Sequence, residues 1–248
     1  MMWKILSIII LIFFINVSFG QEWNEKFGSP IIVLTETNPW LMVIGSDVPT
    51  IAIYESGNII YKRIEKNRMK YFSVKLDSTQ IQNLIYNIGI TDGLVNMKND
   101  IVASSSTDQP TNELILNFDE VIIKRVYGSL RSNNEARKKT PNDFLVIYDN
   151  LTNYKNEQET EWLPDNIEIL LTDFNHSQEK PKKWPKEWPT LESKTTIQRN
   201  ESLYSIYLPK EEVEDFIKLI SDLKETQAVE LNGKKFSISY RLPFPNLR

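Results

Sequence analysis

The stretch YFSVKLDSTQIQNLIYNI, residues Tyr71–Ile88, shows the plan of this chain most clearly. Apolar and polar residues alternate through Leu76, as in a half-buried strand, and the spacing then becomes helical. Asp77 can cap the helix, and Gln80 stands three residues later, where a capping box requires it. The stretch therefore predicts a strand that leads directly into an amphipathic helix.

A second stretch, LYSIYLPKEEVEDFIKLI at Leu203–Ile220, aligns with the first without a gap. A hairpin pattern follows each copy, at Leu114–Tyr127 and at Val229–Tyr240. The chain therefore suggests a strand–helix–hairpin unit that occurs twice by internal duplication. The alternative is that this common unit recurs by chance, because the matching residues are mostly Ile, Leu and Val. The matching apolar pairs are Phe72 with Tyr204, Val74 with Ile206, Leu76 with Leu208, Ile81 with Val213, Leu84 with Phe216, Ile85 with Ile217, and Ile88 with Ile220.

A third helix is predicted from Thr140-Pro141 onward, because an apolar stripe runs from Phe144 to Tyr154. The expected fold class is α+β, with antiparallel sheets and three amphipathic helices. The charged connector Asn156–Glu161 is the best boundary between two units. We expect one unit over residues 21–155 and another over 156–248, or a single continuous domain that contains both.

The first twenty residues read as a signal peptide. Lys4 precedes the apolar run Ile5–Phe14, and Ser18-Phe19-Gly20 places small residues where a signal peptidase reads them. The apolar run is short for a bilayer span, so cleavage is favoured over the alternative of an uncleaved anchor. We expect a secreted or periplasmic protein, of bacterial type, with no membrane span after cleavage.

Composition excludes several kinds of chemistry. The chain has no Cys and one His, His176, so it can form neither disulfides nor a thiolate or His-rich metal site. Its formal net charge of −4 argues against nucleic acid as the main partner. It contains no phosphate-binding glycine loop, dinucleotide fingerprint or nucleophile elbow. We therefore predict no metal and no cofactor.

Paired carboxylates need no sequence motif, and the polar segment Thr91–Thr111 carries three acids, Asp92, Asp100 and Asp108. Binding and catalytic residues often lie on loops that a rigid scaffold positions. These acids are candidates for carboxylate-dependent hydrolysis. The alternative is a solvated loop without a site.

A second candidate is the Trp-Pro segment QEKPKKWPKEWP at Gln178–Pro189. Trp184 and Trp188 could stack on a ligand, and Lys183 and Lys186 could attract anionic groups. The alternative is that both indoles lie on the sheet and pin the segment, with the lysines directed outward.

These observations favour an exported, non-enzymatic protein that binds an envelope or extracellular component, either a glycan or a protein. The alternative is a hydrolase that uses the loop carboxylates on an extracellular glycan or peptide. A binding protein needs an exposed aromatic or apolar surface, whereas an enzyme needs converging acids in a cleft.

Export is directly testable. The mature protein is expected to begin near Gln21 and to be soluble, because the apolar run ends in a cleavable Ser18-Phe19-Gly20 sequence. Intact-mass measurement of protein recovered from a secreting host checks this. A mass that retains residues 1–20, found in the membrane fraction, would contradict it.

Overall fold

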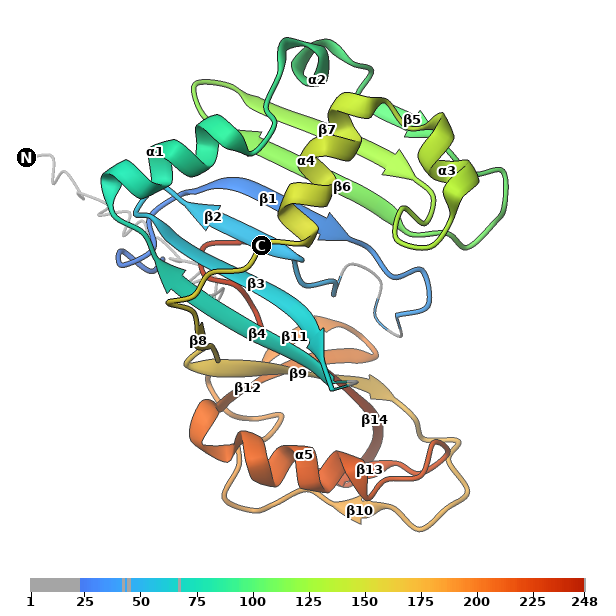
Figure 1. Ribbon diagram of the computed structural model, residues 1–248. Helices are drawn as coiled ribbons and strands as arrows, with labels where there is room; N and C mark the ends of the chain where they lie inside the picture. The colour runs from blue at the N-terminus through green and yellow to red at the C-terminus, as the bar shows by residue number, and fades with distance from the viewer. Residues whose placement is uncertain (1–22, 42, 44–45, 67, 248) are drawn as a thin grey trace, which may run out of the picture.

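The computed structural model describes residues 23–41, 43, 46–66 and 68–247. The predicted signal peptide lies outside this part of the chain. The described residues form two β-sheets and five α-helices, which confirms the predicted α+β class (Figure 1). Among these residues, no helix combines the length and apolar character needed to cross a membrane.

The first sheet has eight strands in the order β5-β7-β6-β1-β2-β3-β4-β8. All neighbours are antiparallel except β5 and β7, which are parallel. The strands are β1 Pro30–Glu36, β2 Ile51–Tyr54, β3 Asn58–Glu65, β4 Arg68–Lys75, β5 Asp100–Val102, β6 Thr111–Asn117, β7 Val121–Tyr127 and β8 Thr160–Glu161.

The second sheet has six strands in the order β10-β13-β14-β9-β12-β11. Here the edge pair β10 and β13 is parallel, and the other pairs are antiparallel. The strands are β9 Asn166–Asp173, β10 Lys182–Lys183, β11 Ile197–Asn200, β12 Leu203–Pro209, β13 Val229–Leu231 and β14 Lys234–Arg241.

The three predicted helices are present as α1, α4 and α5. Two further short helices are present, α2 within the polar segment Thr91–Thr111 and α3 just before α4, and their N-caps are the Thr91 and Asn133 side chains. A 3₁₀ turn, η1, leads into α5. The bounds are α1 Ser78–Asn87, α2 Asp92–Asn96, α3 Asn134–Lys139, α4 Asn142–Thr152, η1 Lys210–Glu212 and α5 Val213–Ser221.

The start of α1 has the predicted capping box. The Asp77 carboxylate accepts from the Gln80 backbone N–H at 2.8 Å, and the Gln80 side chain accepts from the Asp77 N–H at 3.0 Å. The apolar faces of α1 and α5 are less buried than expected: Ile85 is only partly buried, and its counterpart Ile217 is 38% exposed. Leu84 on α1 is also only partly buried. Its counterpart Phe216 on α5 is fully buried and packs against Trp188 with ring centroids 6.2 Å apart.

The two aligned stretches have the same local structure, β4 followed by α1 and β12 followed by η1 and α5. The hairpins after them enter their sheets in opposite order. In the first sheet the leading strand β6 is inner and β7 is outer, whereas in the second the leading strand β13 is outer and β14 is inner. The sequence match therefore reflects a shared strand–helix pattern, and the hairpin connection is not repeated.

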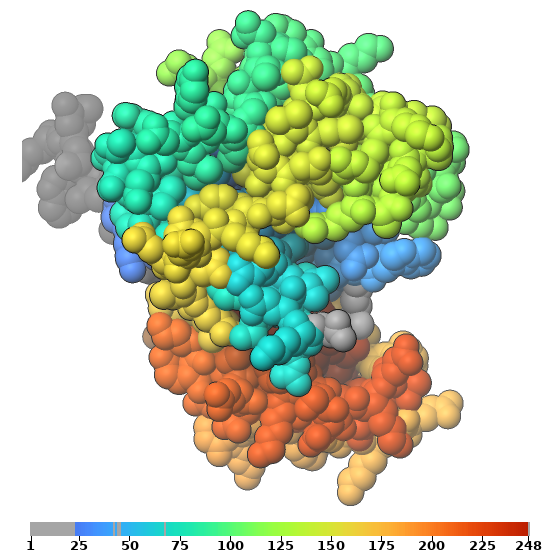
Figure 2. All heavy atoms as spheres, viewed as in Figure 1, coloured from blue at the N-terminus to red at the C-terminus, as the bar shows by residue number. Residues whose placement is uncertain are grey.

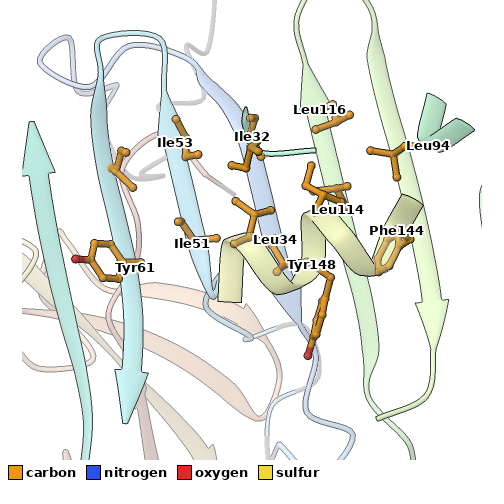
Figure 3. Packing of buried hydrophobic residues seen from close by; sticks show 14 of the residues in the cluster. Ile32, Leu34, Ile51, Ile53, Tyr61, Leu94, Leu114, Leu116, Phe144 and Tyr148 are labelled. Atoms are coloured by element: carbon orange, nitrogen blue, oxygen red, sulfur yellow. The ribbon is translucent and has the colours of Figure 1, made fainter. Parts of the chain in front are cut away.

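Helices lie on the outer sides and the two sheets lie between them (Figure 1). Figure 3 shows α4 across the first sheet, where Phe144 and Tyr148 lie beside Leu34 and Leu114 of the central strands. Helix α5 and the Trp-Pro segment cover one face of the second sheet. The remaining face of each sheet is turned toward the other half of the molecule.

The C-terminal tail joins the two halves. After β14 the chain returns to the first sheet, where Phe244 is 1% exposed and packs in a cluster with Phe27 and Tyr54. The Tyr54 hydroxyl donates to the Pro245 carbonyl at 2.9 Å. Strand β8, which also follows the predicted boundary at 155/156, pairs with β4 of the first sheet. Residues after 155, expected to belong to the second unit, therefore contribute a strand and a buried Phe to the first half.

Loss of the Phe244 side chain should destabilise the first sheet. Phe244→Ala is expected to cost about 3–5 kcal/mol of unfolding free energy, the usual range for a buried Phe. Phe118→Ala, at a residue that is 45% exposed, should cost under about 0.5 kcal/mol. Denaturant midpoints of both variants measure this. Equal midpoints would show that the tail does not hold the halves together.

Candidate functional site

A cleft of about 1030 Å³ lies between the two halves of the molecule. This volume is at the upper end of the range for small-molecule sites, about 300–1,000 Å³, and such sites favour the junctions between packed units. Figure 2 shows the N-terminal half in blue to yellow and the C-terminal half in orange and red, with the β3–β4 hairpin reaching across their boundary in this view. The lining residues are Trp23–Phe27, Asn58, Ser73, Trp162–Asn166, Pro189, Thr195, Tyr207, Pro209, Lys210, Pro243 and Pro245.

The second sheet supplies one side of the cleft. Asn166 pairs with Pro209, and Glu168 pairs with Tyr207, so the four side chains share a face. The intervening residues Ile167 and Leu208 point to the opposite face, into the core under α5. Strand alternation therefore places a polar row toward the cleft and an apolar row toward the helix.

The other walls come from strands β3 and β4 of the first sheet, from the loop between β10 and β11, and from three irregular segments at Trp23–Phe27, Trp162–Asp165 and Pro243–Pro245. The Trp162 ring lies edge-on to Phe244 with centroids 5.3 Å apart, whereas Trp23 is 53% exposed. Proline restricts the backbone of these walls. The cleft thus combines a fixed indole and an accessible one on a stiff frame.

The N-terminal wall is anchored from two sides. Asn246 accepts from the Asn24 backbone N–H at 2.7 Å, and its side-chain amide donates to the Asn24 and Gly28 carbonyls at 3.0 and 2.7 Å. On the sheet side, Asn58 donates to the Lys26 carbonyl at 2.9 Å. These bonds fix the segment that carries Trp23.

Glu168 is the central charged group beside the cleft. It is 1% exposed and accepts from the Ser205 hydroxyl at 2.6 Å. Arg199 Nη2 donates to one of its oxygens at 2.8 Å and Arg241 Nε to the other at 2.6 Å. Arg199 also donates to the Tyr207 hydroxyl at 3.3 Å, which links the network to a residue of the cleft lining.

The balance of burial and charge keeps Glu168 ionised. Burial, the largest single effect, raises the pKa of Glu168, but the Ser205 hydrogen bond and the charges of Arg241 and Arg199 together lower it below its ordinary value. The pKa of Tyr207 is raised, mainly by burial and then by the Glu168 charge. Tyr207 is therefore neutral and can donate its hydroxyl proton.

A smaller hollow of about 490 Å³ adjoins the cleft along β4. It shares Lys26, Asn58 and Ser73 with the main cleft and continues to Lys75 and Thr160. At the other side, Asp165 and Lys210 form an exposed ion pair of 2.9 Å at the rim. The site is therefore elongated, and its rim carries charge of both signs.

The three loop acids lie on separate elements and do not line this cleft. Asp92 is the first residue of α2, Asp100 lies in β5 with Arg125 at 3.7 Å, and Asp108 is in the loop before β6 with a φ of 55°. All three are exposed. Within the described ranges, no cluster of three or more His, Asp or Glu residues could hold a metal ion.

Both indoles of the Trp-Pro segment are buried, each 6% exposed. Trp184 Nε1 donates to the Pro189 carbonyl at 2.9 Å, and Trp188 Nε1 donates to Glu212 at 3.0 Å. Their ring faces are covered by the core under α5, the arrangement expected if the indoles pin the segment. Lys183 is paired with Glu230, and Lys186 is exposed.

Sequence reasoning missed the cleft, but one of its signals was visible. Glu168 interrupts the apolar strand Ile167–Leu171, and a lone acid in such a run implies a buried partner. The local sequence does not identify Trp23, Pro243 or Pro245 as residues of a site. They come together only because the C-terminal tail folds back onto the first half of the molecule.

No family model, curated protein or solved structure matches this chain.

The Glu168 network predicts acid-sensitive stability. Because its folded-state pKa is below the ordinary value of 4.5, the ionised carboxylate stabilises the fold above about pH 4.5, and this contribution is lost as the pH falls through the folded-state pKa. Glu168→Gln should cost about 1–3 kcal/mol at pH 7 and show a shallower loss of unfolding free energy below pH 4.5.

Urea unfolding at a series of pH values measures this difference. Glu161→Gln is the matched control, because Glu161 forms only an exposed pair with Lys70. Parallel stability profiles for wild type and Glu168→Gln would contradict the prediction.

Proposed function

We propose that this protein is an exported, non-enzymatic binding protein whose ligand lies in the cleft between the two sheets. The observation that carries the proposal is that two indoles, the exposed one of Trp23 and the packed one of Trp162, both line a cleft of about 1030 Å³. Aromatic residues with a polar surround are typical of ligand sites. Export rests on the signal-peptide pattern of residues 1–20.

The acids near the cleft favour binding over hydrolysis. A catalytic acid at neutral pH needs a raised pKa, whereas the buried carboxyl here, Glu168, has a lowered one. The lining acids Glu25 and Asp165 are exposed, and Asp165 is paired with Lys210. This arrangement supports electrostatic and structural roles for the acids.

The shape of the site supports an extended ligand from the envelope or extracellular space. The main cleft continues into the smaller hollow along β4, so several units of a polymer could be accommodated. The anchored walls lose little conformational freedom when a ligand binds, which favours affinity.

Trp23→Ala tests the proposal. This change should weaken ligand binding about tenfold, equivalent to about 1.4 kcal/mol, because it removes an exposed ring face without disturbing the core. Trp40→Ala is the matched control, since Trp40 is 75% exposed and does not line the cleft. Glycan and peptide arrays, followed by titration of the positive ligands, measure binding for all three proteins.

Denaturant midpoints should be the same for wild type and both variants. Equal affinities for Trp23→Ala and Trp40→Ala, or the absence of any ligand for wild type, would contradict the proposal.

A further inference from the structure

Two arginines share one carboxylate on the cleft-facing side of the second sheet. Arg241 on β14 and Tyr207 on β12 both pair with Glu168 on β9, so the three side chains form one row on that face. Arg199, on the edge strand β11, reaches across β12 to the same carboxylate. The cluster of Arg199, Arg241 and Glu168, called the arginine pair site below, has a net charge of +1.

The guanidinium groups retain unused donors. Arg199 donates from Nε to Ser205 and from Nη2 to Glu168 and Tyr207. Arg241 donates from Nε to Glu168. Nη1 of Arg199 and both terminal nitrogens of Arg241 donate no hydrogen bond to any other residue that the structure describes. The side chains are 39% and 22% exposed, so solvent and ligands can reach them.

The arginine pair site adjoins the cleft at Tyr207, although Arg199 and Arg241 do not themselves line it. Tyr207 lines the cleft and receives a hydrogen bond from Arg199. Pro243 also lines the cleft and follows Arg241 by two residues. A ligand that extends past Tyr207 toward β11 and β14 would therefore meet the two arginines.

We propose that Arg199 and Arg241 bind a carboxylate of the ligand, and that the ligand is an acidic glycan whose sugars carry carboxylates. This inference rests on the proposed function and names its ligand class. Planar guanidinium groups match the geometry of a carboxylate, which can accept two parallel hydrogen bonds. Trp23 and Trp162 offer ring faces to sugar rings, and Asn166 offers an amide to hydroxyl groups.

Glu168 positions the two arginines. Its hydrogen bonds fix Nε of Arg241 and Nη2 of Arg199, which leaves the remaining donors directed away from the carboxylate. Its charge also cancels one of the two positive charges. Removal of that charge is therefore expected to strengthen anion binding even though it weakens the fold.

The first experiment compares oligogalacturonate with its methyl ester, which has the same sugars without the charge. Wild type should bind the acid at least tenfold more tightly than the ester. Arg241→Gln and Arg199→Gln should lose that preference, while Arg125→Gln keeps it. Arg125 is the matched control because it is an equally charged, partly exposed arginine on β7 of the first sheet, next to the edge strand β5, and is paired with Glu113.

Arg241→Lys is the variant to use if Arg241→Gln does not fold. It keeps a positive charge beside Glu168 but lacks the planar guanidinium group. It should fold as wild type and bind the acid several-fold more weakly. Equal affinity for acid and ester in wild type, or the same acid affinity in Arg241→Gln and Arg125→Gln, would overturn the proposal.

A second experiment separates this inference from the proposed function, using inorganic sulfate as the probe. At matched ionic strength, sulfate in place of chloride should raise the melting temperature of wild type and Arg125→Gln more than that of Arg241→Gln. The shift should be largest for Glu168→Gln, whose site carries a charge of +2. Equal shifts in all four proteins would overturn the anion site, whereas the Trp23→Ala binding test addresses the cleft independently.

Discussion

The packing of Phe244 against the first sheet is the contact on which the geometry of the cleft depends. The tail that carries this side chain leaves the second sheet, crosses to the first, and is hydrogen-bonded through Asn246 to the Asn24–Gly28 segment. Burial of a phenylalanine contributes several kcal/mol, comparable to much of the net stability of a domain. The described strands of the two sheets are not paired with each other, so strand pairing does not fix the distance between the two halves. The packing of Phe244 does.

The same contact orders the walls of the cleft. Phe244 supports Trp162 from one side, and Asn246, two residues later, holds the segment that bears Trp23. Rigid walls matter for a binding protein because flexible ones must be ordered when the ligand arrives, at a cost in affinity. The hydrogen bonds between Asn246 and the Asn24–Gly28 segment thus support the proposed binding role, and the cleft is a product of how the two halves are joined.

Two carboxylates with little solvent exposure, Glu168 and Glu36, each lie at the centre of a hydrogen-bond network. Glu168 binds two arginines across the second sheet, and Glu36 binds Arg131 and Tyr148 where α4 meets the first. In both, burial alone would raise the carboxyl pKa, and hydrogen bonds with nearby positive charge reverse the effect. The two networks differ in position. Only that of Glu168 includes a residue of the described cleft lining, Tyr207, which is why it carries a functional proposal.

Local sequence was enough to predict the α+β class, the strand and helix at Tyr71–Ile88 and at Leu203–Ile220, and the hairpin at Val229–Tyr240, because alternation, capping and turn conformation depend on neighbouring residues. Tertiary structure alone decided the order of the hairpin strands, the burial of Trp184 and Trp188, and the cleft. Strand order and burial depend on partners far along the chain, such as Glu212 for Trp188. The indole side chain itself favours burial, but the packed fold decides which of these two indoles is buried. Trp188 is buried and Trp23 is exposed.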